Sequence, residues 1–261
     1  MQIIWINTCA STQDELSKHP SYISGVYTLD QKKGRGRLGR SWLSAPQKTL
    51  ALSWRVSIQQ IPLEKIPLLS LASGVALYEW LEERFFTKLT QEKKDQLNHK
   101  LCLKWPNDLL FQGKKLAGIL CEGRLGSANP EVLIGIGINL LPDPSLPDQS
   151  CSLVDLLDEL GLFEAKASLL DSERHSFIDK ELRYLCKKLE DLPVVLQEQV
   201  YLDNMLDHWR ARALPIGTVL STQQHQGTFQ GITAQGALLL DNGERVVTVE
   251  SGEVNLLSAL V

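Results

Sequence analysis

Alternation of apolar and polar residues predicts strands in the first half of the chain. Every even-numbered position from 50 to 56 is apolar, which is the period-two pattern of a strand buried on one face. Positions 132 to 138 alternate in the same way. With two shorter apolar runs, the strands expected on this basis are residues 49–57, 101–105, 115–121 and 131–139. A turn that contains Gly113 would join the second and third of these strands.

Helical spacing follows in other regions. After Pro67, apolar residues recur three and four positions apart from Leu68 to Val75, as on the buried face of a helix. Residues 150–210 carry amphipathic helical patterns with an excess of acidic residues. We expect these helices to cover the sheet and to take no part in chemistry. The polar residues 88–100 are expected to form a loop or the extension of a helix.

The pattern changes again near the C-terminus. Short alternating segments separated by glycines begin at Leu214, and Asn242-Gly243 is a strong hairpin signal. This change predicts two domains. Residues 1–211 would form an α+β domain with a mixed sheet flanked by helices, and residues 212–261 a small β-barrel or sandwich.

The composition is that of an ordinary enzyme. The 261 residues are 43% hydrophobic and 22% charged, enough for one large core and a small appended domain. No segment approaches the ~20 apolar residues that span a bilayer, and the N-terminus lacks a signal-peptide pattern. The five cysteines form no Cys-x-x-Cys pair, so we expect reduced thiols and a cytoplasmic protein without membrane contact. Neither metal-ligand histidine spacing nor a Gly-x-Ser-x-Gly motif is present.

The strongest local signal is Gly34-Arg-Gly-Arg-Leu-Gly-Arg40. With the two lysines before it, residues 32–40 (the anion loop) hold five positive charges and no acid, in a chain whose net charge is -4. Glycine lets a backbone approach a ligand closely, and arginine presents a planar fork of donors to phosphate or carboxylate. Because the positive charge is local, we expect a small anionic ligand.

Other interpretations of the anion loop are weaker. The spacing Gly34-x-Gly36-x-x-Gly39 matches a dinucleotide fingerprint, but no helix pattern follows it, as a Rossmann turn requires. A protein kinase is excluded because His-Arg-Asp and Asp-Phe-Gly are missing. A solvated basic loop or a nucleic-acid tail stays open when the loop is considered alone.

Two glycines inside an expected strand are a second indication of a binding surface. Gly135 and Gly137 share one face of the strand 131–139 with Asn139. Glycines weaken a strand unless something must approach its backbone. A ligand and a tightly crossing helix or strand explain them equally well.

A second charged motif is Lys104-Trp-Pro-Asn-Asp108, followed by Lys115-Leu-Ala-Gly-Ile-Leu120. Together with the anion loop, in this order and at these separations, these motifs resemble those of biotin protein ligases. The resemblance runs from the pair Ser11-Thr12 to Gly252-Glu253-Val254, which is nearly the whole chain. The chain departs from the family pattern at Gln13, where asparagine is usual, and at Ser251 and Asn255.

The resemblance implies a fold and a reaction. The fold would be a class II synthetase-like catalytic domain followed by an SH3-like domain. The reaction would join biotin to ATP, with Mg²⁺, as biotinyl-5'-AMP and pyrophosphate, and then transfer biotin to a lysine of a biotin carboxyl carrier protein. The chain resembles the short form that lacks an N-terminal helix-turn-helix, so DNA is not an expected partner. Family members can pair through their catalytic sheets, which allows a homodimer.

The resemblance also assigns site residues. Arg37 and Lys115 would hold the reacting carboxylate and the α-phosphate, and Asp108 would lie in the adenylation site as a third catalytic residue. The expected biotin-binding residues are Ser11, Thr12, Gln31, Gly34, Arg35, Arg37, Lys115, Gly135 and Gly137. The expected ATP- and adenylate-binding residues are Arg37, Arg40, Trp42, Asn107, Asp108, Lys115 and Asn139. No metal-binding residue is expected in the protein.

Each of these residues also has a plain structural explanation. Lys115 could be an exposed hairpin lysine, and Trp42 a core residue. Asn107-Asp108 is a common turn or helix cap. Ser11-Thr12 could cap a helix, with Glu15 completing a capping box.

Two other functions remain open. A lipoate or octanoate ligase would share the fold and the acyl chemistry, although the anion loop argues against it. A nonenzymatic nucleic-acid binder would use the anion loop alone, and the net negative charge of the chain disfavours it.

Overall fold

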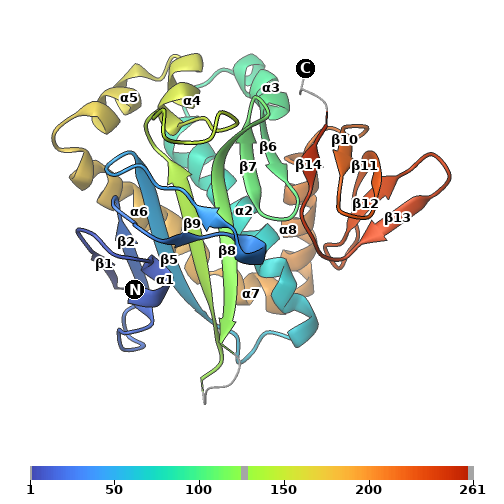
Figure 1. Ribbon diagram of the computed structural model, residues 1–261, viewed down its shortest axis with the longest axis horizontal. Coiled ribbons are helices and arrows are strands. Elements are labelled where there is room, and N and C mark those ends of the chain that lie inside the picture. The colour runs from blue at the N-terminus through green and yellow to red at the C-terminus, as the bar shows by residue number, and fades with distance from the viewer. Residues whose placement is uncertain (1, 125–128, 258–261) are drawn as a thin grey trace.

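The structure, a computed structural model, describes residues 2–124 and 129–257. Its centre is a seven-stranded mixed sheet (Figure 1). In sheet order the strands are β1 (Ile3–Trp5), β2 (Gly25–Thr28), β5 (Thr49–Ser57), β9 (Glu131–Asn139), β8 (Lys114–Arg124), β7 (Asp108–Phe111) and β6 (Leu101–Lys104). β1 and β2 pair in parallel, and the other neighbours pair antiparallel.

The two most regular alternating segments, now β5 and β9, are confirmed as strands and lie side by side. Leu50 pairs with Ile138, and the register continues through the whole of both strands. Their alternating apolar positions belong to the main hydrophobic core, because residues two apart in a strand share a face. Gly135 and Gly137 therefore lie on the opposite face of the sheet.

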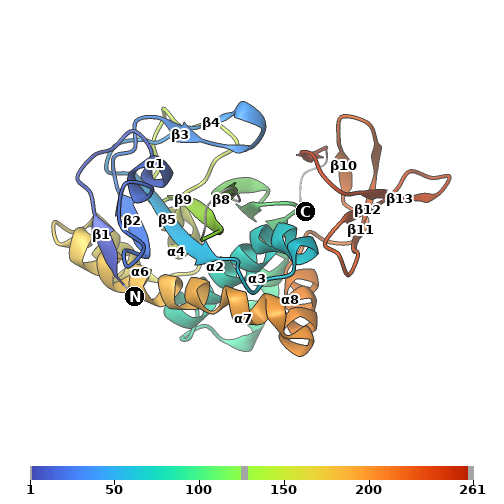
Figure 2. The same cartoon turned by 90° about the horizontal axis from the view of Figure 1, so that it is seen from below.

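Helices cover one face of the sheet, as expected. After the 3₁₀ helix η2 (Leu63–Leu68) they are α2 (Leu69–Phe85), α3 (Gln91–Lys100), α4 (Leu153–Glu159), α5 (Phe163–Leu170), α6 (Arg174–Glu190), α7 (Leu192–Gln197) and α8 (Gln199–Ala211). Figure 2 shows α2, α6, α7 and α8 beneath the sheet. The other face carries α1 (Thr12–Leu16) and the short hairpin of β3 (Gly34–Arg35) and β4 (Ser41–Trp42). Residues 91–100 are helical, and Pro67 lies inside η2 rather than at the start of α2.

One strand is a correction to the sequence analysis. Residues 101–104 and 114–124 are not joined directly, because β7 (Asp108–Phe111) lies between them. The turn with Gly113 joins β7 to β8 instead, and both Gln112 (φ 50°) and Gly113 (φ 75°) are left-handed, as in a two-residue hairpin. The three apolar residues after Asp108 show no alternation, so their pattern could not identify a strand.

The C-terminal region forms a second, five-stranded antiparallel sheet. Its strands in sheet order are β13 (Val246–Val249), β12 (Leu238–Asp241), β11 (Gln226–Ile232), β10 (Val219–Ser221) and β14 (Asn255–Leu256). Asn242-Gly243 lies in the hairpin between β12 and β13, as predicted. The indole of Trp105 donates a hydrogen bond to the carbonyl of Gly236 at 2.9 Å, which fixes this sheet to the end of β6.

Candidate functional site

A pocket of about 910 Å³ lies on the face of the main sheet that carries the β3–β4 hairpin. Its walls come from the anion loop, α1, the central strands, the loop at residues 146–150 and the C-terminal segment at residues 253–257. Every site residue expected from the sequence lines this pocket except Gly34, which lines a second hollow on the other side of the anion loop. Residues separated by more than 120 positions in the chain thus meet in one place.

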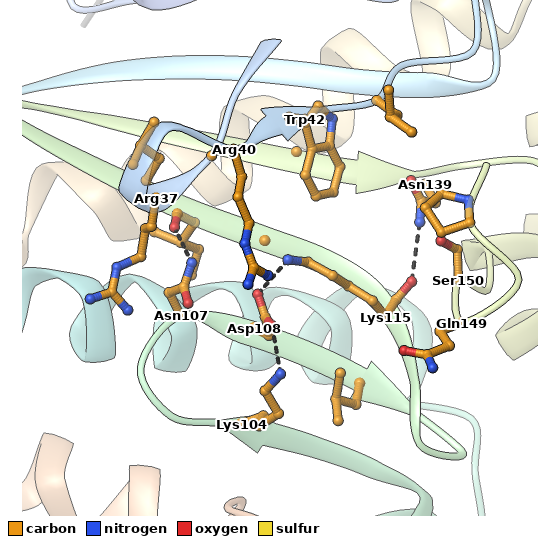
Figure 3. Close-up of a pocket in the computed structure, with 18 of the residues that line it drawn as sticks. Arg37, Arg40, Trp42, Lys104, Asn107, Asp108, Lys115, Asn139, Gln149 and Ser150 are labelled. Atoms are coloured by element: carbon orange, nitrogen blue, oxygen red, sulfur yellow. Dashed lines mark hydrogen bonds and ion pairs between the residues drawn. The ribbon is translucent and has the colours of Figure 1, made fainter. Parts of the chain in front are cut away.

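Asp108 is the centre of the charged end of the pocket (Figure 3). Its carboxylate contacts the ammonium of Lys115 at 2.6 Å and that of Lys104 at 3.0 Å. Asp108 is only 9% exposed. Burial raises the pKa of its carboxyl, but the two lysines outweigh burial and hold that pKa below its ordinary value. The site therefore keeps a buried carboxylate ionised between two cations.

Sheet register explains this cluster. Lys104 stands opposite Asp108 in the β6–β7 pair. On the other side of β7 the register shifts between Leu109 and Leu110, so that Leu110 pairs with Lys115. Lys115 thereby reaches Asp108, whereas its neighbour Lys114 is exposed. The alternative of a helix or turn cap at Asp108 does not describe its side chain, because Asp108 begins strand β7 and its carboxylate contacts the two lysines.

The arginines of the anion loop have three different environments. Arg35 is paired with Asp14 at 2.7 Å and with Glu122 at 2.9 Å, so it ties the loop to α1 and β8. Arg40 forms an ion pair with Glu253 of the C-terminal segment. Within the described part of the chain, Nη1 of Arg37 is buried and has no hydrogen-bond partner. Burial lowers the pKa of Arg37 from its ordinary value, but a guanidinium stays charged in proteins.

Trp42 explains the glycines of the central strands. Its indole lies so close to Gly137 that a Cβ there would be 2.3 Å from the ring, and a Cβ on Gly118 would be 3.0 Å away. At Gly135 the close neighbour is the side-chain amide of Gln13 from α1, 3.0 Å from such a Cβ. Packing of a helix residue and a strand residue therefore accounts for both strand glycines, and direct contact with a ligand stays a prediction.

The ammonium of Lys115 lies 5.4 Å from the centre of the Trp42 ring. A cation at this distance is attracted by the ring face. Trp42 is half-buried, which disagrees with a core role, and its Nε1 is a buried donor without a partner among the described residues. The indole is thus placed between the charged cluster and the sheet.

The opposite end of the pocket is neutral. Thr12 donates from its backbone N–H (2.8 Å) and its hydroxyl (3.2 Å) to the side-chain oxygen of Gln31. Ser53 donates to the hydroxyl of Thr12 at 2.8 Å. Gln13 donates to the carbonyls of Leu120 and Leu133 at 3.1 and 3.2 Å. These buried hydroxyl and amide groups form a network suited to a neutral polar ligand group.

The alternative of a capping box at Ser11 is not formed, although Ser11 occupies the N-cap position of α1. Helix α1 begins at Thr12, and the side chain of Ser11 makes no capping hydrogen bond. Glu15 is the fourth helical residue and not the third, so it cannot complete the box. The side chain of Ser11 is buried and lines the pocket.

Two asparagines hold the charged end together. Asn107 donates to the carbonyl of Ile119 at 2.7 Å. Asn139 donates to the carbonyls of Lys115 and Cys151, both at 3.1 Å. In this structure the Asn139 amide nitrogen therefore fixes the strand that carries Lys115, and its contact with a nucleotide stays a prediction.

Several pocket residues were not assigned a role from the sequence. Lys104 belongs to the quoted motif and lies four positions before Asp108. This spacing alone did not show that the two residues face each other on paired strands. Gly118 lines the pocket, and Ser53 supports it through its bond to Thr12. Both come from strands in which a single residue carries no signal. Glu253 belongs to the quoted segment Gly252-Glu253-Val254, but only the docked second sheet brings it to Arg40.

No group of three or more His, Cys, Asp or Glu side chains able to hold a metal occurs within residues 2–124 and 129–257. The donor set in the pocket consists mainly of cations and amides. A Mg²⁺ ion that enters with a nucleotide would be held chiefly by phosphate oxygens and water. None of the helices in the described ranges is long and apolar enough to cross a membrane.

The fold and the site define a class of enzyme with a neutral polar subsite beside a cluster of cations, suited to joining a small acid to a phosphate. Comparison with known proteins gives the same class. The model of the biotin/lipoate A/B protein ligase family matches residues 3–139, and that of the biotin protein ligase C terminal domain matches residues 218–257. The chain belongs to this family and is of its biotin protein ligase type.

Two curated relatives and one solved structure give the degree of similarity. The chain is 30% identical to a biotin--[acetyl-CoA-carboxylase] ligase of Mycobacterium tuberculosis, covering 89% of this chain and 79% of that protein. It is also 30% identical to a bifunctional ligase/repressor of Bacillus subtilis, covering 97% and 74%. A structure of the biotin protein ligase of Aquifex aeolicus in complex with biotin and ATP superposes with a TM-score of 0.70 at 26% identity, covering 98% of both chains.

Proposed function

We propose that this chain is an ATP-dependent biotin protein ligase that forms biotinyl-5'-AMP and then transfers biotin to a lysine of a carrier protein. The observation that carries the proposal is the single pocket in which a cluster of cations adjoins a neutral, hydrogen-bonding subsite. Adenylation needs this combination, because the reaction brings a carboxylate against a phosphate and both are anions.

The charged end would hold the reacting groups. Arg37 has a buried donor without a partner within the described ranges, and we assign it to the biotin carboxylate and the α-phosphate together with Lys115. Arg40 would turn from Glu253 towards the phosphates when ATP binds. Catalysis would consist of positioning and charge stabilisation, as is typical of phosphoryl chemistry. Mg²⁺ would neutralise phosphate charge as part of the nucleotide complex.

The neutral end would hold the ring system of biotin. A ureido group has two N–H donors and one carbonyl acceptor, and Thr12, Gln13 and Gln31 offer hydroxyl and amide groups close together. Ser11 would add a second hydroxyl. Gly135 and Gly137 would form the floor beneath Gln13 and Trp42, because a larger residue at either position would push these side chains into the space of the rings. Trp42 would then lie between this end and the nucleotide.

In the second step, the amine of the acceptor lysine attacks the acyl carbon of the anhydride, and AMP leaves. A lysine ammonium has an ordinary pKa of about 10.4 and must lose a proton before it can attack. Asp108 is the buried carboxylate at this end of the pocket, so we assign it to both steps. It places the ammonium of Lys115 for adenylation, and it attracts the acceptor ammonium for transfer. The proton that this ammonium loses passes to water. The acceptor proposed is a biotin carboxyl carrier protein, in line with the name of the Mycobacterium tuberculosis relative.

Further proposals concern organisation. We place the domain boundary between residues 211 and 212, where α8 ends, and assign the second sheet to the C-terminal domain. The cysteines in the structure are free thiols, which supports a cytoplasmic location. A homodimer formed through the catalytic sheets would use an exposed sheet edge, and β1 is such an edge.

The test of the function is biotin-dependent exchange of labelled pyrophosphate into ATP, with lipoate and octanoate in parallel. Exchange needs no acceptor protein. We expect exchange with biotin and none with lipoate or octanoate. The match to the biotin protein ligase C terminal domain favours this result. Exchange with lipoate or octanoate instead would move the chain to the related ligases, and no exchange with any acid would reject adenylation.

A further inference from the structure

Lys104 is a charged residue of the pocket to which the adenylation chemistry above gives no task. Its ammonium contacts Oδ2 of Asp108, whereas the ammonium of Lys115 contacts Oδ1. The two lysines therefore hold different oxygens of one carboxylate, and Figure 3 shows them on opposite sides of it.

The two lysines differ in freedom. The side chain of Lys104 is 16% exposed, and that of Lys115 is 37% exposed. Lys104 pairs directly with Asp108 in the β6–β7 register, so the geometry of the sheet keeps this contact. Lys115 reaches across the open pocket and lies beside Trp42.

In the proposed function, a bound acid or phosphate would take up the charge of Lys115. Asp108 would then be a carboxylate that is nine-tenths buried and has lost its closer partner. A buried charge without a partner is strongly unfavourable, and the carboxyl would take up a proton instead. Lys104 is the cation that can prevent this, because it stays in place. Arg37 also interacts electrostatically with Asp108 but would itself be turned to the ligand.

We propose that Lys104 is a positioning residue that keeps Asp108 ionised and fixed while Lys115 is transferred from Asp108 to the reacting anion. Lys104 touches no reacting atom in this scheme. The scheme rests on the proposed ligase function for its timing, but the pairing of Lys104 with Asp108 can be measured without activity.

The first experiment measures that pairing by urea unfolding. Lys104→Met and Lys115→Met are each prepared alone and combined with Asp108→Asn. The free energy of unfolding of each protein is measured at pH 7, and the non-additive part is the coupling of that lysine to Asp108. We expect a larger coupling for Lys104, because its ion pair is less exposed. Equal or weaker coupling for Lys104 than for Lys115 would overturn the proposal.

The second experiment measures the pH profile of biotin-dependent pyrophosphate exchange. The two lysines lower the pKa of Asp108 against the opposite effect of burial. Without Lys104, the acid limb of the profile should move to higher pH by roughly one unit or more, the usual effect of one close opposite charge. Lys104→Arg should restore it. If loss of Lys104 lowers the exchange rate equally at every pH and leaves the acid limb where it is, Lys104 does not keep Asp108 ionised.

A matched control is Lys100→Met, which removes an exposed lysine whose partner is Glu159 at 2.6 Å. Lys100→Met should show no coupling to Asp108 and should leave the pH profile of exchange unchanged. If the wild-type protein exchanges with no acid at all, the ligase function fails, and the unfolding experiment still decides whether Lys104 is the permanent partner of Asp108.

Discussion

The two ends of the pocket differ in how their polar groups are stabilised. At the charged end, Asp108 is ionised because cations from two neighbouring strands hold it. At the neutral end, Thr12 lies in a chain of uncharged hydrogen bonds that joins α1, Gln31 and β5. Charge attracts an anion from a distance, whereas neutral groups select a ligand by position. The charged end should therefore control the rate of adenylation, and the neutral end the choice of acid.

Replacement of Lys115 by alanine should have the largest effect. Loss of one well-placed cation at a developing charge typically slows a reaction by ~100- to 1000-fold. We expect this loss in biotin-dependent pyrophosphate exchange, with the affinity for biotin reduced much less. Lys100→Ala is the matched control, because Lys100 is also ion-paired but lies outside the pocket. A loss below tenfold would remove Lys115 from the reacting centre.

A methyl group on Gly137 should have the next largest effect. Its Cβ would be 2.3 Å from the Trp42 ring, and overpacking of this kind typically costs ~1–3 kcal/mol. We expect Trp42 to be displaced, with a change in tryptophan fluorescence and a higher KM for ATP. Gly135→Ala is the comparison at the neutral end. Its neighbour there is the flexible amide of Gln13, so its effect should be smaller and appear in the KM for biotin. If both glycine substitutions change the KM for ATP and the KM for biotin equally, the two ends of the pocket are not distinct subsites.

The sequence predicted the charged end better than the neutral end for a physical reason. The anion loop and the segment Lys104–Asp108 are continuous, so residue type and spacing within each were informative. The contact between Lys104 and Asp108 was still missed, because it needs strand β7, whose apolar run has no period. Register between strands is set by the whole sheet, which one segment does not reveal.

The neutral end depends on contacts across long stretches of sequence. Ser53 meets Thr12 across 41 positions, and Gln13 meets Leu133 across 120. Single serine and glutamine residues carry no pattern, and only the family resemblance selected Ser11, Thr12 and Gln31. The strands β5 and β9, by contrast, were predicted from alternation alone, because burial of one face imposes a period of two.

Replacement of Thr12 by valine should weaken biotin binding about tenfold, or ~1.4 kcal/mol. One net hydrogen bond contributes ~1 kcal/mol, and its loss also leaves Gln31 and Ser53 partly unpaired. Calorimetric titration with biotin measures the change, and ATP binding should be unaltered. Thr28→Val is a control, because Thr28 is a buried threonine of β2 whose hydroxyl donates to the carbonyl of Asn7 outside the pocket. An equal loss of ATP affinity would mean that the neutral end is not a separate subsite.

The smallest effect is expected at the tip of the anion loop. Leu38 (φ 51°) and Gly39 (φ 75°) are consecutive left-handed residues in a turn closed by the bond from Arg40 N–H to Arg37 O at 3.1 Å. A left-handed leucine costs ~1–2 kcal/mol, whereas Asn-Gly is the preferred pair for this turn. Leu38→Asn should therefore favour the hairpin turn that the structure shows.

We expect trypsin to cleave the empty Leu38→Asn protein at Arg37 and Arg40 about fivefold more slowly than the wild type, which corresponds to ~1 kcal/mol when cleavage follows the open population. Biotin with ATP should protect both proteins, and the difference between them should then shrink. Cleavage at the remote Arg183, which is exposed on α6, is the internal reference. An unchanged rate in the empty variant would show that the turn at Leu38 does not limit opening of the loop, and that the ion pairs of Arg35 and Arg40 hold it instead.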